Sequence, residues 1–535
     1  MKKYFIALAC LAAAAMVSCT RDFNPESVSA GKVLTLSLTR EVPGQDTKAA
    51  LDGTSVVFQA DDAVSVMSGS ENARFTTVSG GAPASFSGTA SDAEQYVVLS
   101  PYNAEAALQS ASVVRITIPE VQNAVPGGVD PKALISAGIA LKGASSVKLF
   151  NAVSLVKVEV PGGLTVKELQ VAGGFGQNIA IGGQFDFNAQ EESLALSVVA
   201  NKTSTVVTLV PAEGESIIAP GTYYVAVRPK TTYDGGFTVA YVDGDNQLCK
   251  RATRTAADIQ RSHIFPVGTL NTTDYAAVTG RATLRYADSA PQFTGLIKQL
   301  AGGSGAVLDK DYTIRKIVFR AHSLYSQAYK AGGNLISNGP NSDVQIHAWV
   351  IDDTAYVYTE APIITLYSAS GNLFRDFEAL EEVSFNDVNT MAGASFEYMF
   401  RNCTNLKSVD FGNADFSNVT TYGWMFANAQ KLERVSFGET ATTSATSMQS
   451  MFSQVFNLRY LYLGKNFTLP ANVTNMFNGT ASVTTTVQDE EGHGLQCKLH
   501  ASQALWDTLN TDLNGDGVNT TTGFNKNRFY FTPVD

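Results

Sequence analysis

The stretch that decides the fold of the C-terminal half is MFRNCTNLKSVDFGNADFSNVT, residues 399–420. A unit of this length is too small to bury its own apolar face, so a recurring unit must stack on its neighbours around a shared core. The apolar pattern does recur, at intervals of 26, 26 and 25 residues, as Met399-Phe400, Met425-Phe426, Met451-Phe452 and Met476-Phe477. Leucines keep the same 26-residue period at Leu380, Leu406, Leu432 and Leu458.

These units resemble the BspA-like leucine-rich repeats of bacterial surface proteins. The resemblance also draws on His347-Ala348-Trp349-Val350 and Leu373-Phe374, and it covers residues 344–480. Two units depart from the pattern, because residues 438–450 lack the Asp-x-Ser-Asn-Val form and residues 464–475 are one residue short. The resemblance implies a leucine-rich-repeat solenoid, with residues 271–343 as linker and N-terminal cap and residues 481–535 as C-terminal cap. Proteins of this family are usually adhesins.

The Met, Phe and Leu positions are expected in the core, because apolar residues at repeat spacing form the interior of stacked units. Cys403 lies inside the best copy of the unit, and we expect it to be buried rather than nucleophilic. Ligand contacts would come from variable positions expected at the surface, which are Arg401, Lys407, Tyr422, Trp424 and Arg459.

The N-terminal half alternates apolar and polar residues in short runs separated by turn signals, which is typical of antiparallel β-sandwiches. Short motifs in this half resemble the fimbrillin family: Thr47-Lys48-Ala49, Leu149-Phe150-Asn151-Ala152, Pro220-Gly221-Thr222-Tyr223 and Phe265-Pro266-x-Gly268-x-Leu270. The resemblance implies two transthyretin-like β-sandwich domains, at residues 31–163 and 164–270, and a place in fimbriae or related structures.

In the fimbrillin family an Arg-specific protease can remove the first strand, and another subunit then fills the groove with a strand of its own. Arg40, just after the expected strand at residues 33–38, matches that site in position. The alternative is a solvent-facing arginine in a turn. Fimbrial subunits are therefore expected partners through strand exchange.

The N-terminus reads as a lipoprotein leader. Met1-Lys2-Lys3 is followed by an apolar run that ends at Ser18-Cys19, which resembles the bacterial lipobox. The resemblance implies that residues 1–18 are a signal peptide, that Cys19 is lipidated, and that residues 19–30 are a polar tether. We expect the chain to be anchored by lipid in the outer membrane, at the cell surface.

Composition limits the partners. The 535 residues carry a net charge of −11 without a cluster of Lys and Arg, which argues against nucleic-acid binding. The five cysteines show no metal-binding or disulfide spacing. We expect no cofactor and no enzymatic activity, because the sequence shows no clustered acid–base pair or activated nucleophile.

One loop carries weak calcium candidates. Asp512, Asn514 and Asp516 copy the first half of a calcium-binding loop, but Gly523 stands where the bidentate glutamate belongs. An Asx-rich turn is the alternative interpretation.

We therefore expect a surface lipoprotein that acts as an adhesin or as a tip or accessory subunit of fimbriae. It would bind host or bacterial surface ligands, protein or glycan, through its repeat domain. The alternative is a glycan-capturing lipoprotein that serves nutrient uptake.

Overall fold

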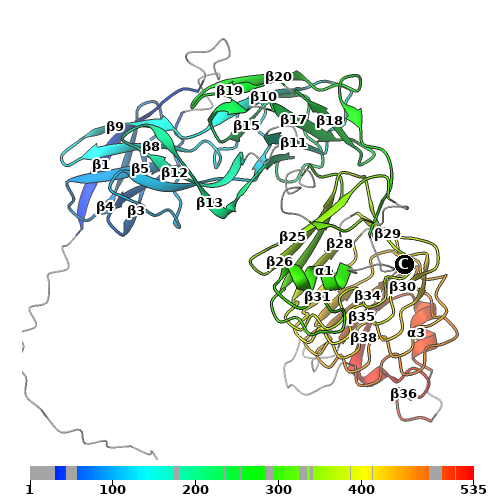
Figure 1. Ribbon diagram of the computed structural model, residues 1–535. Coiled ribbons are helices and arrows are strands. Elements are labelled where there is room, and N and C mark those ends of the chain that lie inside the picture. The colour runs from blue at the N-terminus through cyan, green and yellow to red at the C-terminus, as the bar shows by residue number, and fades with distance from the viewer. Residues whose placement is uncertain are drawn as a thin grey trace, which may run out of the picture.

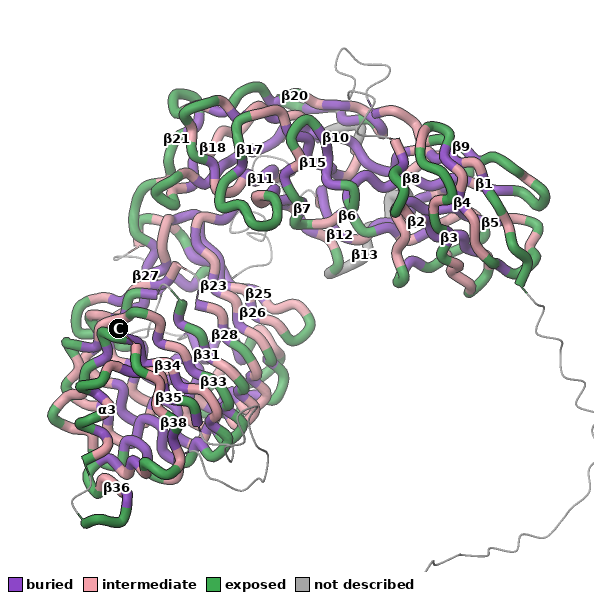
Figure 2. Tube along the Cα trace, turned by 180° about the vertical axis from the view of Figure 1, so that it is seen from behind, coloured by how far each residue is buried: buried purple, intermediate pink, exposed green. Residues whose placement is uncertain are grey.

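The computed structural model shows an upper body formed by the N-terminal half and a lower body that contains the C-terminal sheet (Figure 1). Buried residues run along the strands of both bodies (Figure 2). The structure describes residues 31–43, 57–173, 180–233, 235–253, 255–284, 293–324, 334–337, 342–385, 387–412, 414–480, 497–511 and 514–534.

The first unit is a closed barrel. Strand β1 (Lys32–Arg40) pairs antiparallel with β4 (Ala84–Ala90) and parallel with β9 (Ser146–Asn151), so both of its edges are bonded. Its apolar residues alternate, and Leu36 and Leu38 point into the core. The other strands, in barrel order after β4, are β3 (Glu71–Ser79), β2 (Ala63–Ser68), β5 (Gln95–Ser100) and β8 (Ser136–Leu141).

The second unit consists of three further sheets. One is β15 (Gly221–Val227), β10 (Ser154–Val160) and β20 (Ile264–Thr269). The next is β13 (Ser193–Ser204), β12 (Gly182–Asn188) and β6 (Val113–Ile118). The third, in order, is β21 (Ala276–Ala277), β18 (Leu248–Ala252), β17 (Phe237–Val242), β11 (Glu168–Gly173), β14 (Val206–Val210) and β7 (Val121–Asn123).

Strands β6 and β7 belong to the sheets of the second unit, although they come before barrel strands β8 and β9 in the chain. They precede residue 163, where the sequence places a domain boundary, but they pair with β12 and β14 beyond it. The boundary stays a prediction, and the β-strands on its two sides share sheets.

The lower body is dominated by a ten-stranded mixed sheet. Only β24–β25 and β25–β26 pair antiparallel within it, and every other pairing is parallel. Its order is β24 (Asn334–Leu335), β25 (Ile346–Ile351), β26 (Thr354–Thr359), β23 (Lys316–Arg320), β28 (Glu382–Phe385), β31 (Ser408–Asp410), β33 (Arg434–Ser436), β34 (Tyr460–Gly464), β35 (Cys497–Ala501) and β38 (Phe529–Pro533).

Smaller elements complete the two bodies. Helix α1 (Phe293–Leu300) packs against the sheet core, and helix α3 (Gln503–Leu509) lies near the C-terminus. The remaining elements are β16 (Lys230–Tyr233), β19 (Ala257–Ile259), β22 (Ala282–Thr283), β27 (Ile364–Leu366), β29 (Val388–Thr390), β30 (Ala394–Ser395), β32 (Val419–Thr421), β36 (Val518–Asn519), β37 (Phe524–Asn525) and the 3-10 helix η3 (Lys526–Arg528).

The 26-residue period appears as strand register. Val383 lies opposite Val409, Val409 opposite Val435, and Val435 opposite Leu461. Phe374 and the phenylalanines of the four Met-Phe pairs stack on the core side of the sheet, with successive ring centroids 5.0 to 5.4 Å apart, in the order Phe374, Phe400, Phe426, Phe452 and Phe477. All four Met-Phe pairs and Cys403 are buried, which confirms their predicted place in the core.

The expected leucine-rich-repeat solenoid, which is one part of the expected fold class, is wrong. The described residues are mainly β, but they form barrel-like and sandwich-like sheets, with no leucine-rich-repeat solenoid among them. A repeat period indicates that the units stack on one another, but it does not specify the architecture that the stacked units form. Here each unit adds one short strand to a sheet that the non-repeat strands β23–β26, β35 and β38 also build, around one continuous core. The first expected sandwich is likewise replaced by a closed barrel.

Candidate functional site

The outward face of the ten-stranded sheet is the candidate site. In its parallel strands every second residue enters the core, as Val409, Val435 and Leu461 do, and the residues between them point outward. Along β28, β31, β33, β34 and β35 the outward side chains are polar, charged or aromatic. On β23 and β25 the outward face also carries Val318 and Ile351, which pack against the second unit. From β28 to β35 the alternation of the strands thus presents a surface of polar and aromatic side chains.

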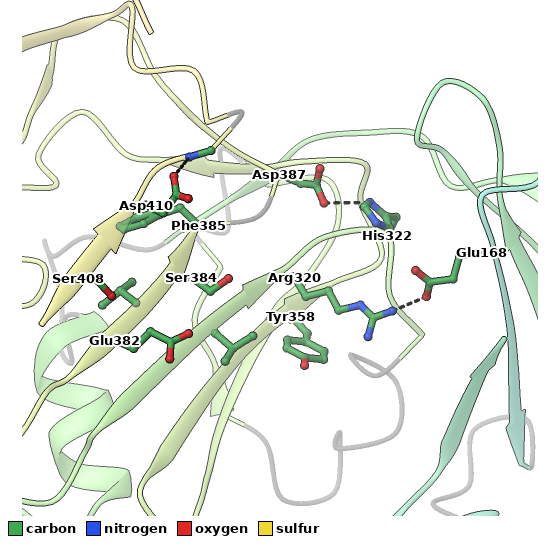
Figure 3. Close-up of a pocket in the computed structure, with 13 residues that line it drawn as sticks. Glu168, Arg320, His322, Tyr358, Glu382, Ser384, Phe385, Asp387, Ser408 and Asp410 are labelled. Atoms are coloured by element: carbon green, nitrogen blue, oxygen red, sulfur yellow. Dashed lines mark hydrogen bonds and ion pairs between the residues drawn. The ribbon is translucent and has the colours of Figure 1, made fainter. Parts of the chain in front are cut away.

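One part of this face is enclosed by the second unit. A groove of about 670 Å³ lies between β11 and the sheet (Figure 3). The side chains that line it come from five strands and two connecting loops. They include Glu168, Arg320, His322, Tyr358, Glu382, Ser384, Asp387, Ser408 and Asp410.

Two charge pairs frame this groove. The Arg320 guanidinium, at the end of β23, is paired with the Glu168 carboxylate of β11. The Nδ1 atom of His322 lies 3.4 Å from an Asp387 carboxylate oxygen. Both residues of the second pair have positive φ angles, 40° for His322 and 52° for Asp387, a conformation uncommon outside glycine. Burial lowers the pKa of His322, and the Asp387 carboxylate opposes that shift.

Three aromatic side chains of β25 and β26 lie beside this groove: Tyr358 lines it, whereas Trp349 and Tyr356 line a second groove. The rings of Trp349 and Tyr356 stack with centroids 5.5 Å apart, and Tyr358 meets Trp349 edge-on at 5.0 Å. Burial raises the pKa of Tyr358 to about 12, so its hydroxyl stays protonated at neutral pH. The second groove, of about 510 Å³, shares Arg320 and Tyr358 with the first and runs from these rings toward Lys202 of β13.

The joint between the two bodies is held by buried polar contacts. The Gln170 side chain of β11 donates from Nε2 to the His322 carbonyl at 2.9 Å and accepts at Oε1 from the Leu324 backbone N–H at 2.8 Å. Lys250 pairs with Glu360 at 2.6 Å across the same joint. Trp349 and Tyr358 pack there against Val206, Ala240, Val242 and Leu248. The grooves therefore lie between parts that these contacts hold in place.

The surface positions that the sequence proposed for ligand contact do not line the first groove. Tyr422 is fully buried, so the expectation that it is exposed is wrong, because its ring packs on Phe396 and Phe437. Arg401 lies between Tyr398 and Trp424, with its guanidinium 5.2 and 5.6 Å from their rings. Lys407 is exposed and Arg459 is half-buried.

Arg40 ends β1 and is half-buried, not a solvent-facing residue of a turn. Its guanidinium lies 4.4 Å from the Phe58 ring and donates from Nε to Ser136 at 3.2 Å. Burial lowers its pKa to about 10. The next residue, Glu41, is paired with Arg261 and bonded to Leu149 through its backbone. Cleavage after Arg40 stays a prediction, and it would require this end of the strand to open.

Two other predicted sites fall wholly or partly outside the described residues. Cys19 lies outside them, so its lipidation stays a prediction. Asp512 also lies outside, whereas Asp516 accepts at Oδ1 from the Val518 backbone N–H at 2.9 Å, as in an Asx turn. Calcium binding by Asp512, Asn514 and Asp516 therefore stays a prediction.

Searches for a metal cluster and for a membrane-spanning helix find neither in the described part of the chain. There, no three His, Cys, Asp or Glu side chains are grouped so that they could hold a metal ion. None of the described helices has the length and apolar content needed to span a membrane.

Sequence reasoning missed the groove. Glu168, Arg320 and Asp387 are far apart in the chain and belong to no recurring motif, so no local signal marks them. The pairing of β23 with β28 and the docking of β11 bring them together.

Comparisons with known proteins give partial likenesses. A family described as "Mycoplasma protein of unknown function, DUF285" matches residues 369–489. No curated protein matches the chain.

Among solved structures, the chain is similar to a "putative cell adhesion protein" from Bacteroides ovatus, at 10% identity and a TM-score of 0.31, over 46% of this chain and 96% of that one. It is similar to the tip fimbrial protein Mfa3 from Porphyromonas gingivalis at 8% identity and a TM-score of 0.24, over 46% and 97%. A fimbrial protein from Bacteroides ovatus follows at 12% and 0.21, over 60% and 65%. Likeness at this level carries no argument about function.

Proposed function

We propose that the chain is a cell-surface adhesion subunit whose C-terminal sheet domain binds the ligand through its outward face. One observation carries the proposal: this face is polar and aromatic, and it borders a groove of about 670 Å³ beside the second unit. Surfaces that combine concave shape, aromatic rings and a few placed polar groups are typical binding sites. The similar solved proteins are described as adhesion and fimbrial proteins, and the proposed function is of the same kind. Their TM-scores are too low for this likeness to support the proposal.

In this proposal the N-terminal half is the stalk. Lipid on Cys19 would hold the chain to the outer membrane, and the barrel and second unit would carry the sheet domain away from it. The buried contacts of the joint support this role, because Gln170 and the Lys250–Glu360 pair fix the sheet domain to the second unit.

The test is adhesion by cells that display the full chain. We expect displaying cells to adhere to host or bacterial surfaces, and Arg320→Ala with Tyr356→Ala to reduce adhesion at unchanged surface display. Gln190→Ala, an exposed position of the second unit, serves as the control. Adhesion that survives the groove variants and the loss of the whole sheet domain would contradict the proposal.

We also propose a tip or accessory place in fimbriae for a processed form of the chain. Cleavage after Arg40 would separate Cys19 and its lipid from the body, so a permanently anchored form would have to escape this cleavage. Strand β1 bridges β4 and β9, so its removal would leave two strand edges facing one groove, into which another subunit's strand could fit. The test is treatment of purified protein with an Arg-specific protease. Short assemblies are expected from a tip subunit, and long polymers of this chain alone would exclude that place.

Glycan capture for nutrient uptake is the second candidate function. The half-buried Tyr356 ring in the lining of the second groove favours it, because aromatic faces pack well on the apolar faces of sugars; Trp349 is buried behind this ring. A growth defect on one polysaccharide after deletion of the gene, without an adhesion defect, would favour this function over adhesion.

A further inference from the structure

The far end of the same sheet face carries a distinct set of side chains, which we call the basic-aromatic patch. It is formed by the outward residues of β33, β34, β35 and β38, away from the groove at β11. Its members are Arg434, Tyr460, Tyr462, Lys498, His500 and Tyr530.

Strand register arranges the patch in two rows. Arg434 lies opposite Tyr460, Tyr460 opposite Lys498, and Lys498 opposite Tyr530. Tyr462 lies opposite His500 in the second row. Adjacent strands are about 4.8 Å apart, so a row across four strands extends about 14 Å. The patch therefore suits an extended ligand better than a single small ion.

The side chains of the patch contact one another. The Arg434 guanidinium carbon lies 3.9 Å from the Tyr460 ring centroid, and the Tyr460 and His500 rings are 5.0 Å apart. The Tyr462 hydroxyl donates to Glu439 at 2.8 Å. Tyr530, on the edge strand β38, is 42% exposed. The patch thus combines cations, hydroxyl groups and accessible rings.

The two ends of this sheet face differ in whether their cationic side chains have ion-pair partners. Near the groove Lys316 pairs with Glu382 at 3.0 Å, and Arg320 pairs with Glu168. Within the described part of the chain, neither Arg434 nor Lys498 has an ion-pair partner, although both are exposed. Burial lowers the pKa of His500, and the positive charges of Lys498 and Arg434 lower it further. On a chain with net charge −11, Arg434 and Lys498 therefore place two cations without ion-pair partners among the described residues on this part of the face, beside the Glu439 carboxylate that Tyr462 bonds.

From this arrangement we infer that the basic-aromatic patch binds an anionic carbohydrate chain. The inference rests on the proposed adhesive function and names the ligand class for one part of its surface. Arg434 and Lys498 would bind carboxylate or sulfate groups, and the tyrosine rings and hydroxyls would contact the sugar rings. A peptide that adds a strand to a sheet edge does not fit, because the patch is the face of paired strands. An acidic peptide held by basic side chains is the competing ligand, and the row of tyrosine rings favours a carbohydrate over it.

The experiment measures binding of the purified full chain to immobilised polysaccharides. The probes are polygalacturonate, which carries carboxylates, chondroitin sulfate, which carries both groups, and neutral dextran. We expect binding to one or both anionic probes, at least tenfold tighter than to dextran and weakened by added salt. Binding to polygalacturonate identifies carboxylate as sufficient, and binding to chondroitin sulfate alone identifies a requirement for sulfate. Equal binding to dextran overturns the inference.

Variants locate the site. Arg434→Ala with Lys498→Ala should weaken anionic binding at least tenfold, and Tyr530→Ala should weaken it several-fold. Lys316→Ala is the matched control, because Lys316 lies in the same row of the face but pairs with Glu382; it should change binding less than twofold. An equal loss in the control, or no loss in the double variant, overturns the inference.

Two further measurements, polyglutamate binding and cell adhesion, distinguish a wrong ligand class from a wrong proposed function. If polyglutamate binds as tightly and responds to the same variants, the patch recognises acidic peptides and the carbohydrate assignment is wrong. If the double variant loses no cell adhesion while wild-type cells adhere, the inference fails and the adhesive function stands. If wild-type cells do not adhere but the purified chain binds the anionic probe, the proposed function fails and the inference stands.

Discussion

The N-terminal barrel and the ten-stranded sheet differ in how their strands are paired at the edges and in how their cores are packed. The barrel removes its edges by closing: each of its strands is bonded on both sides, as β1 is to β4 and to β9, so the loss of any one strand would open it. The sheet stays open and repeats one packing solution, with a stacked phenylalanine in each unit. The barrel therefore shares one closed core among all its strands, whereas the sheet adds core contacts one repeat unit at a time.

This difference can be measured separately in the two regions. All three tryptophans, Trp349, Trp424 and Trp506, belong to the C-terminal half. Tryptophan fluorescence consequently reports on the sheet domain, whereas far-ultraviolet circular dichroism reports on all strands.

Phe426→Ala should have the largest effect. Phe426 is fully buried between Phe400 and Phe452, with ring centroids 5.4 Å away on each side. Removing its ring should lower the free energy of unfolding by about 3–5 kcal/mol. The check is urea unfolding followed by tryptophan fluorescence, with exposed Lys407→Ala as control. A loss below about 1 kcal/mol would mean that the stack relaxes around the cavity.

Leu38→Ala tests the barrel's dependence on β1. Leu38 is fully buried in the barrel core, so its truncation should cost about 2–5 kcal/mol. The circular dichroism transition should shift to lower urea, and the fluorescence transition should not move. Val33→Ala, which is 70% exposed on the same strand, is the control. If fluorescence shifts equally, the two regions unfold as one unit and the comparison fails.

Gln170→Ala tests how firmly the regions are joined. The substitution leaves the His322 carbonyl and the Leu324 N–H without their side-chain partner in a buried joint. We expect a loss of about 1–3 kcal/mol, seen by fluorescence because Trp349 packs at the joint. Gln190→Ala, exposed on the second unit, should have no measurable effect. An unchanged transition for Gln170→Ala would show that the apolar contacts alone hold the joint.

Acidification should produce the smallest of these changes in the free energy of unfolding. Burial lowers the pKa of His322 in the folded protein below its unfolded value of about 6.5. The unfolded chain then binds more protons in this range, so the stabilising contribution is present above pH 6.5 and is lost as pH falls below it.

The pH prediction is checked by comparing unfolding at pH 7.5 and 5.5. His322→Asn removes the titrating group, and asparagine tolerates the positive φ of this position, so this variant should lose less stability on acidification. His500 has a lowered pKa as well and shifts the background in the same direction in both proteins. Stabilisation of the wild-type protein at pH 5.5 relative to His322→Asn would show that Asp387 outweighs burial.

Local patterns predicted much of the β-structure. The alternation in residues 33–38 became β1, and the Met-Phe pairs entered the core as expected, because a side chain's burial follows from its periodicity. The expectation for Tyr422 is wrong although the sequence held the signal: Phe396, Tyr422 and Met448 recur every 26 residues, and all three are buried. The solenoid was wrong because the period does not specify which other strands join the same sheet.

By itself, the sequence determined that the chain is rich in β-strands and that its C-terminal units stack in register, because both follow from the spacing of apolar residues along the chain. Only the tertiary structure decided that β1 closes a barrel, that β6 and β7 join the sheets of the next unit, and that Glu168 meets Arg320 across a groove. These contacts join segments distant in sequence, and their energy depends on the packing of whole units.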